Sequence, residues 1–231
     1  TFENVCEGGT IQLGTTTTGQ GYLYSWTGPD GFVSTLANPA NITNVQTSKQ
    51  GKYQLVINVE NCSSDTATTN VIVLPTPPTP EITGESIYCE GSTFSLVVNN
   101  LPLQEKYTWY KDGVKFRVTN DNSLEILNVS NSATGLWQVI VESNGCPSDT
   151  SAGKFISIDN LTVIGASNSG PACAGDTIDL SATFVPNSTY MWEGPGGFKD
   201  IGQFVKALAK SGDYFVTITT TTGCFNVTST S

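Results

Sequence analysis

The stretch Trp26-Thr27-Gly28-Pro29-Asp30-Gly31-Phe32 (WTGPDGF) recurs later in the chain as WEGPGGF, at residues 192–198. A Gly-Pro-x-Gly run suits a tight connection between two strands, because proline presets one turn dihedral and glycine accepts a positive φ. A tryptophan on the strand before such a turn is typical of the core of a β-sandwich. We therefore predict that Trp26 and Trp192 are core residues rather than exposed platforms for sugar stacking. Phe32 and Phe198 remain candidate ligand contacts.

The motif is part of a repeat with a period of 83 to 84 residues. Each repeat begins with a cysteine that opens a Cys-x-Gly tripeptide and continues with a tryptophan 19 or 20 residues later. An aromatic residue two positions after a glycine follows, and a second cysteine ends the repeat. The aligned residues are Cys6, Cys89 and Cys173; Trp26, Trp109 and Trp192; Tyr53, Trp137 and Tyr214; and Cys62, Cys146 and Cys224. About seven short strands per 80 residues is sandwich spacing, so the repeat predicts an all-β chain of three tandem sandwich domains in an elongated array. The tryptophans and the second aromatics are the predicted core.

The composition supports this fold class and limits the partners. Charged residues make up only 13% of the chain, and no stretch carries a helical apolar stripe. The formal charge of −10 opposes both nucleic acid and the anionic face of a membrane. With no apolar run of about 18 residues, we predict no membrane insertion in this segment.

Two junctions divide the repeats. The proline-rich stretch 74–80 favours polyproline II and predicts a semi-rigid linker. The stretch 155–163 has neither proline nor glycine and predicts a stiffer joint. The expected domains are residues 1–76, 77–159 and 160–231, and shorter flanks make the first look N-terminally clipped and the last C-terminally clipped.

The middle repeat, with Trp109-Tyr110-Lys111-Asp112-Gly113 before its Gly-x-aromatic corner, resembles the immunoglobulin-like fold. The fuller pattern resembles the Ig-like or PKD-like repeats of large secreted cell-surface adhesins of Bacteroidetes bacteria. That resemblance implies an extracellular, cell-surface location, type IX secretion and the gliding-motility type of adhesin. Two departures matter. The usual second Ig cysteine is replaced by Leu55, Val139 and Val216, so the familiar inter-sheet bridge cannot form. The aspartate that often precedes the corner is replaced by Lys49, Ala133 and Lys210.

Six cysteines without a metal or redox motif predict disulfides and an oxidising compartment. Equal spacing favours bridges inside each domain, each contributing roughly 3–4 kcal/mol by loop entropy. These pairs would be Cys6–Cys62, Cys89–Cys146 and Cys173–Cys224. The alternative places the two cysteines at opposite ends of each sandwich and pairs them between neighbouring domains. It gives Cys6–Cys146 and Cys89–Cys224 and leaves Cys62 and Cys173 for units outside this segment. We favour the pairs within domains.

The chain is predicted not to be an enzyme and to need no cofactor. It contains no histidine, which excludes Ser-His and Cys-His pairs and histidine-ligated metals. Calcium at the domain junctions is a weaker alternative, since only Glu81, Glu85 and Asp159 are available there, too few oxygens for a full shell.

The leading functional hypothesis is a structural and adhesive stalk whose partners are neighbouring repeats and a polysaccharide or protein ligand at a surface. The second is a dedicated carbohydrate- or protein-binding module that uses the basic hairpin with Lys111, Lys115 and Arg117. The third is a passive spacer attached to a secreted hydrolase. The resemblance to Bacteroidetes proteins also implies O-glycosylation at Asp-Thr-aliphatic triplets, which here contain Thr66 and Thr177.

Overall fold

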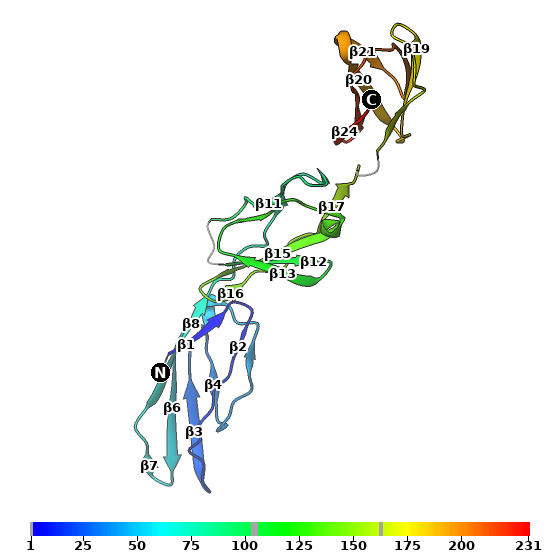
Figure 1. Cartoon of the computed structure of the whole chain (residues 1–231). Helices are drawn as coiled ribbons and strands as arrows, with labels where there is room; N and C mark the ends of the chain where they lie inside the picture. The colour runs from blue at the N-terminus through cyan, green and yellow to red at the C-terminus, as the bar shows by residue number, and fades with distance from the viewer. Residues whose placement is uncertain (1, 103–105, 162–163) are drawn as a thin grey trace.

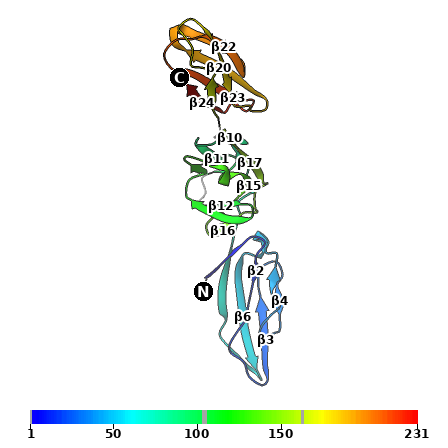
Figure 2. The same ribbon diagram turned by 45° about the vertical axis from the view of Figure 1, so that its right-hand side comes forward.

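The computed structural model describes residues 2–102, 106–161 and 164–231, and it folds into three sandwich units that follow one another end to end (Figures 1 and 2). We call them units 1, 2 and 3. The all-β, Ig-like fold class is thereby confirmed. The predicted boundaries at residues 76/77 and 159/160 stay predictions, and residues 162–163 of the predicted stiff joint lie outside the described part. No helix in that part is long and apolar enough to cross a membrane.

Unit 1 consists of a six-stranded sheet and a two-stranded one. The large sheet has the order β1-β8-β6-β3-β4, with β7 added to β6, and the small sheet pairs β2 with β5. The bounds are β1 (Phe2–Cys6), β2 (Thr10–Ile11), β3 (Tyr22–Thr27), β4 (Val33–Ser34), β5 (Ile42–Thr43), the 3-10 helix η1 (Thr47–Lys49), β6 (Gly51–Val59), β7 (Cys62–Ser63) and β8 (Ala67–Leu74).

Unit 2 repeats this plan. Its large sheet has the order β10-β17-β15-β12-β13, with β16 added to β15, and its second sheet has the order β14-β11-β9. The bounds are β9 (Ile82–Thr83), β10 (Ile87–Cys89), β11 (Phe94–Val98), β12 (Lys106–Lys111), β13 (Val114–Thr119), β14 (Ser123–Ile126), η2 (Asn131–Ala133), β15 (Gly135–Ser143), β16 (Cys146–Pro147) and β17 (Lys154–Asp159).

Unit 3 differs at one edge of its large sheet. That sheet has the order β21-β20-β23-β24, and the second sheet has the order β18-β19-β22. Among the described residues, unit 3 has no counterpart of the parallel first strand that units 1 and 2 place beside β8 and β17. The bounds are β18 (Ala166–Asn168), β19 (Thr177–Ala182), β20 (Ser188–Gly194), η3 (Pro195–Gly197), β21 (Phe198–Ile201), β22 (Phe204–Leu208), β23 (Tyr214–Thr220) and β24 (Phe225–Thr230).

Each unit has its own apolar core between its two sheets, centred on the repeat tryptophan. Trp109 and Trp192 are fully buried and Trp26 is 6% exposed. Each indole N–H donates a hydrogen bond inside the unit, to Leu36 O, Thr119 Oγ1 or Gly202 O. The indole rings can therefore be buried without leaving an N–H donor unsatisfied.

The second aromatic closes the core at the corner before the long central strand. Tyr53 and Trp137 are fully buried and Tyr214 is 2% exposed. The Tyr53 hydroxyl donates to Lys49 O at 2.9 Å, and the Tyr214 hydroxyl donates to Leu208 O at 2.9 Å. The corner thus anchors the preceding turn to the sheet.

The Gly-Pro-x-Gly-Phe motif packs around this corner tyrosine. A Cβ on Gly194 would lie 2.5 Å from the Tyr214 ring, so the ring lies where any side chain at that position would be. Phe198 meets the same ring edge-on at 5.7 Å, and Phe32 meets Tyr53 at 5.4 Å. These contacts give the two phenylalanines a role in packing, and nothing in the structure assigns them to a ligand.

Candidate functional site: the joints between units and the basic hairpin

The disulfides join successive units. Cys6 of unit 1 is bonded to Cys146 of unit 2, and Cys89 of unit 2 is bonded to Cys224 of unit 3, with Cα–Cα distances of 5.5 and 5.4 Å. Cys62 and Cys173 are free and exposed. The favoured pairing within domains is therefore wrong, and the alternative pairing between neighbours is confirmed.

Strand geometry explains this result. β1 runs parallel to β8 in the register Phe2↔Asn70 to Cys6↔Leu74, so Cys6 lies where β8 leaves unit 1. Cys62 is the first residue of β7, directly after the β6–β7 turn, and pairs with Val59. At about 3.3 Å per residue, the length of β6 separates the two cysteines by far more than the 7 Å that a disulfide permits between Cα atoms.

The first cysteine is presented by the same backbone turn in all three units. Gly9 N–H donates to Cys6 O, Ser92 N–H to Cys89 O and Asp176 N–H to Cys173 O. A second bond fixes this turn to the unit: it runs from Gly8 to Val45 O, from Gly91 to Val129 O and from Gly175 to Ala209 O. The turn around Cys173 is thus built like those of the two bonded cysteines.

The joint between units 2 and 3 also has a polar contact that the sequence did not indicate. Asp159, the last residue of β17, accepts hydrogen bonds from the hydroxyls of Thr220 and Thr222 beside Cys224. Asn226 Nδ2 donates to Leu161 O at 2.9 Å. The threonine run before the late cysteine was the available signal, but its partner cannot be known until the units are placed end to end.

These contacts bear on the calcium alternative. Asp159 is held by hydroxyl donors, Glu85 is exposed, and the Glu81 backbone N–H donates to Asn100 Oδ1. Within residues 2–102, 106–161 and 164–231, no three His, Cys, Asp or Glu side chains lie close enough together to hold a metal ion. The structure does not bring the three predicted junction acids into one cluster.

The basic hairpin of unit 2 is formed by β12 and β13, with β13 at the edge of the large sheet. Lys111 forms an ion pair with Asp112 at 2.7 Å, and Asp112 also accepts a hydrogen bond from Leu136 N–H at 2.8 Å. The Lys111 hydrogen bond, followed by the Leu136 bond, lowers the pKa of Asp112. Asp112 therefore holds the hairpin to β15, and Lys111 is engaged in the ion pair with Asp112.

The other two basic residues lie on the exposed edge strand. Lys115 is exposed, while Arg117 donates to Glu125 O at 3.0 Å and its guanidinium lies 5.4 Å from the centre of the Phe116 ring. Three apolar residues beside them were not expected from the sequence. Val114, Phe116 and Val118 are 71%, 43% and 38% exposed. β13 therefore presents a mixed apolar and basic surface.

The predicted glycosylation sites lie on the surface. Thr66 is in the exposed segment between β7 and β8, and Thr177 is the exposed first residue of β19. Modification at these positions remains a prediction.

No protein-family model matches this chain, and no curated protein matches its sequence. Many solved structures match the fold of this chain at low sequence identity. Murine CEACAM1b is 16% identical over 68% of this chain and 96% of that chain, with a TM-score of 0.44. The ectodomain of mouse nectin-like molecule 4 is 11% identical over 99% and 95%, with a TM-score of 0.41. A marsupial T cell receptor is 12% identical over 99% and 98%, with a TM-score of 0.47. Similarity at this level says nothing about ligands or partners.

Proposed function

We propose that this chain is a stalk segment of an extracellular cell-surface protein, in which disulfides couple each Ig-like unit to the next. The observation that carries the proposal is the pairing of Cys6 with Cys146 and of Cys89 with Cys224. A bridge inside a unit stabilises that unit, whereas a bridge between units restricts how one unit moves on the other. Restricted joints are what a spacer that must keep its reach requires.

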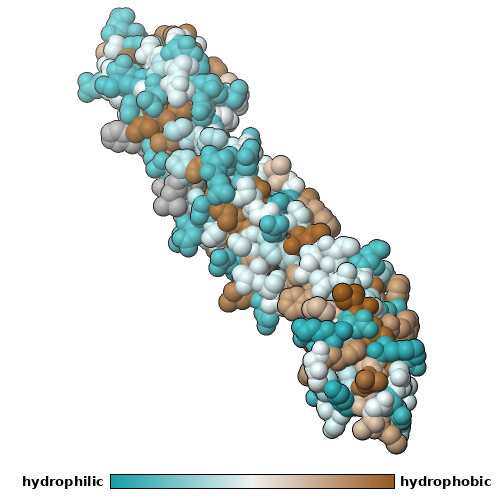
Figure 3. Space-filling model, turned by 90° about the horizontal axis from the view of Figure 1, so that it is seen from above, coloured by the Kyte–Doolittle hydropathy of each residue, from teal (hydrophilic) through white to brown (hydrophobic). Residues whose placement is uncertain are grey.

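The chemistry of the bonds favours a place outside the reducing cytosol, since disulfides persist in oxidising compartments. The resemblance to repeats of secreted Bacteroidetes adhesins supports a bacterial cell surface reached by type IX secretion. Hydrophilic and hydrophobic residues are interspersed over the elongated particle (Figure 3), as for a segment surrounded by water.

Small-angle scattering tests the stalk. We expect an elongated particle on the order of 100 Å long, from units of about ten-residue strands, with a well-defined maximum dimension when oxidised. After reduction the distribution of distances should broaden while each unit stays folded. A compact particle, or a profile that reduction leaves unchanged, would contradict the proposal.

A second candidate function is recognition of a protein or polysaccharide by the β13 edge. Its apolar residues lie beside Lys115 and Arg117, and an exposed sheet edge offers backbone groups for pairing. Binding should be measured against a panel of polysaccharides and cell surfaces.

For any ligand found there, the double variant Lys115→Glu and Arg117→Glu should weaken binding at least about tenfold if the edge carries it. Lys206→Glu in unit 3 is the matched control, because it reverses one exposed charge on another strand. Equal binding by the double variant and the control would remove β13 from consideration.

A further inference from the structure

The free end of unit 3 lacks three features that units 1 and 2 share at the same place. In those units the last strand continues beyond the corner aromatic, a short strand pairs parallel to it, and the first cysteine is bonded to the next unit. Unit 3 has the cysteine in the same turn, but Cys173 is free and exposed.

The strand registers define what differs. Tyr53 pairs with Thr69, Trp137 with Lys154 and Tyr214 with Thr230, so these three partners are equivalent. In units 1 and 2 the strand goes on to a residue that faces the corner glycine: Val71 faces Gly51 and Ile156 faces Gly135. The equivalent glycine of unit 3 is Gly212, and no strand pairs with it in the described part of the chain.

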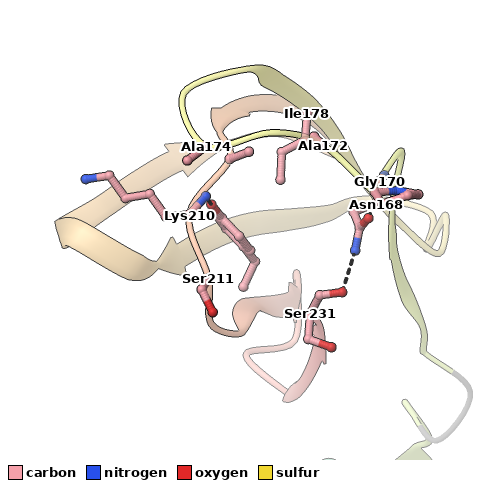
Figure 4. A pocket seen from close by; sticks show the side chains of 11 residues that line it. Asn168, Gly170, Ala172, Ala174, Ile178, Lys210, Ser211 and Ser231 are labelled. Atoms are coloured by element: carbon pink, nitrogen blue, oxygen red, sulfur yellow. Dashed lines mark hydrogen bonds between the residues drawn. The ribbon is translucent and has the colours of Figure 1, made fainter.

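The residues that continue the strand are core residues in units 1 and 2. Val71 and Val73 are 0% and 4% exposed, and Ile156 and Ile158 are 0% and 7% exposed. They alternate, as the inward side of a strand requires. In unit 3 a hollow lies at the corresponding place, in line with the end of β24 (Figure 4).

The hollow is lined by apolar residues of the unit 3 core, by residues of the Cys173 turn, and by the polar residues Asn168, Lys210, Ser211 and Ser231. Ile178, Ala209 and Tyr214 form its floor, and Ala172 lies at its rim. A backbone donor also lies open there. Glu7 N–H donates to Leu74 O and Glu90 N–H to Asp159 O, but the equivalent N–H of Ala174 has no such partner among the described residues.

We propose that this end of unit 3 is a socket for a further unit of the same repeat. The strand leading to that unit continues β24 into the hollow with β-branched residues at alternate positions, and the turn between its last strands presents a cysteine to Cys173. The two existing joints decide the occupant, because in both of them a first cysteine in this turn is bonded to the late cysteine of another unit of the same repeat. The same pairing of a first cysteine with a late cysteine applies at the opposite end of the array. There the late cysteine Cys62 faces the first cysteine of a unit that stacks on unit 1.

The bond that forms is a disulfide between Cys173 and the late cysteine of the added unit. Each thiol loses a proton, and the two electrons pass to a disulfide oxidant such as oxidised glutathione, which is reduced to two thiols.

The chain itself supplies the parts for the test. In the test chain, Ser231 is replaced by a second copy of residues 70–159. Thr230 is equivalent to Thr69, so the copy of Asn70 follows it just as Asn70 follows Thr69 in β8. We expect Cys173 to form a disulfide with the appended copy of Cys146 in a glutathione buffer. Alkylation of Cys173, complete in the original chain, should fall at least about tenfold, and mass spectrometry should find the cross-linked peptide.

The control carries the same residues 70–159 after Ser231 instead. One extra residue turns the apolar side chains of the new strand to the opposite face, so Cys173 should stay reactive. If the in-register chain folds and its Cys173 is as reactive as in this control, the proposal is wrong.

A shorter extension keeps the test independent of the added unit. Residues 70–74 alone, placed after Thr230, should raise the melting temperature of unit 3 by about 5 °C or more, whereas the same residues after Ser231 should not. Equal melting temperatures for the two extensions would also overturn the proposal. None of these results depends on whether the array binds a surface, so the stalk and adhesion proposals stand or fall separately.

Discussion

At the scale of single residues, Gly28 and Gly194 are required by the packing of an aromatic ring that lies far away in the sequence but next to them in the fold. Their conformations do not require glycine, but the rings of Tyr53 and Tyr214 occupy the space of a side chain. The repeat identified the motif as a tight turn and its tryptophan as core. It did not show that the motif also packs a tyrosine that follows about 20 to 25 residues later, because that contact depends on how β3 and β6 pair.

We expect Gly194→Ala to destabilise unit 3 by about 1–3 kcal/mol, since the new methyl group forces the Tyr214 ring out of its packed position. Gly165→Ala is the matched control in the same unit, because its Cβ would lie 3.4 Å from Thr183 Oγ1. Thermal unfolding of both variants checks this. Similar melting temperatures would mean that the ring moves at little cost.

The turn of unit 1 carries a pH-dependent contact. Lys49 lies 2.7 Å from Asp30, and its hydrogen bond followed by its charge lowers the pKa of that carboxyl below 3.8. A carboxyl with a lowered folded-state pKa stabilises the fold above its unfolded value, and the effect is lost as pH falls through the folded value. Wild type should therefore melt above Asp30→Asn at pH near 6, and the gap should close as the pH falls well below 4. A gap that persists in acid would assign the stability to packing.

At the scale of strands, the parallel pairing of β1 with β8 decides the architecture of the joints. It carries Cys6 to the exit of unit 1, and β10 does the same for Cys89 beside β17. The two cysteines are 51 to 57 positions apart in every repeat, and this spacing fits both pairings. The two disulfide pairings can be distinguished only when it is known at which end of a unit each cysteine lies. That position depends on a parallel strand pair between residues about 70 apart, which local sequence does not reveal.

This geometry predicts how removal of a bridge acts. The variant Cys6→Ala with Cys146→Ala should leave the folds of units 1 and 2 intact, because neither unit contains a bridge between its own strands. The angle between the units should vary more widely, as measured by scattering or by NMR relaxation of each unit. Unfolding of a unit on loss of the bridge, well beyond the effect of truncating buried Cys146, would show that the bond stabilises the fold itself.

At the scale of the whole molecule, three cores lie in series with covalent bridges at both joints. The fold class, the repeat and the position of each core tryptophan followed from periodicity, which is a local property. The surface of β13 could not be predicted in this way, because it depends on which strand becomes the edge of the sheet. The contacts of Asp159 could not be predicted either, because they depend on how one unit meets the next.

The described joints contain hydroxyl donors and disulfides, and among the described residues no three acidic side chains gather there. We therefore expect a calcium chelator to leave both the melting temperature and the scattering profile unchanged. A fall in melting temperature or a loss of length with chelator, restored by added calcium, would instead support the calcium alternative at the junction acids.

The order of the bridges also sets how far the chain can be stretched by force. Tension applied at the two termini passes from Cys6 to Cys146, back through unit 2 to Cys89, and across to Cys224. Only about 70 residues lie on this covalent path, so the contour length is limited to roughly 250 Å, against roughly 800 Å for the reduced chain. Unit 1 beyond Cys6 and unit 3 before Cys224 lie off this covalent path. The tether therefore stays short under a pull strong enough to unravel unit 2, and reduction turns the same chain into one that extends about three times as far.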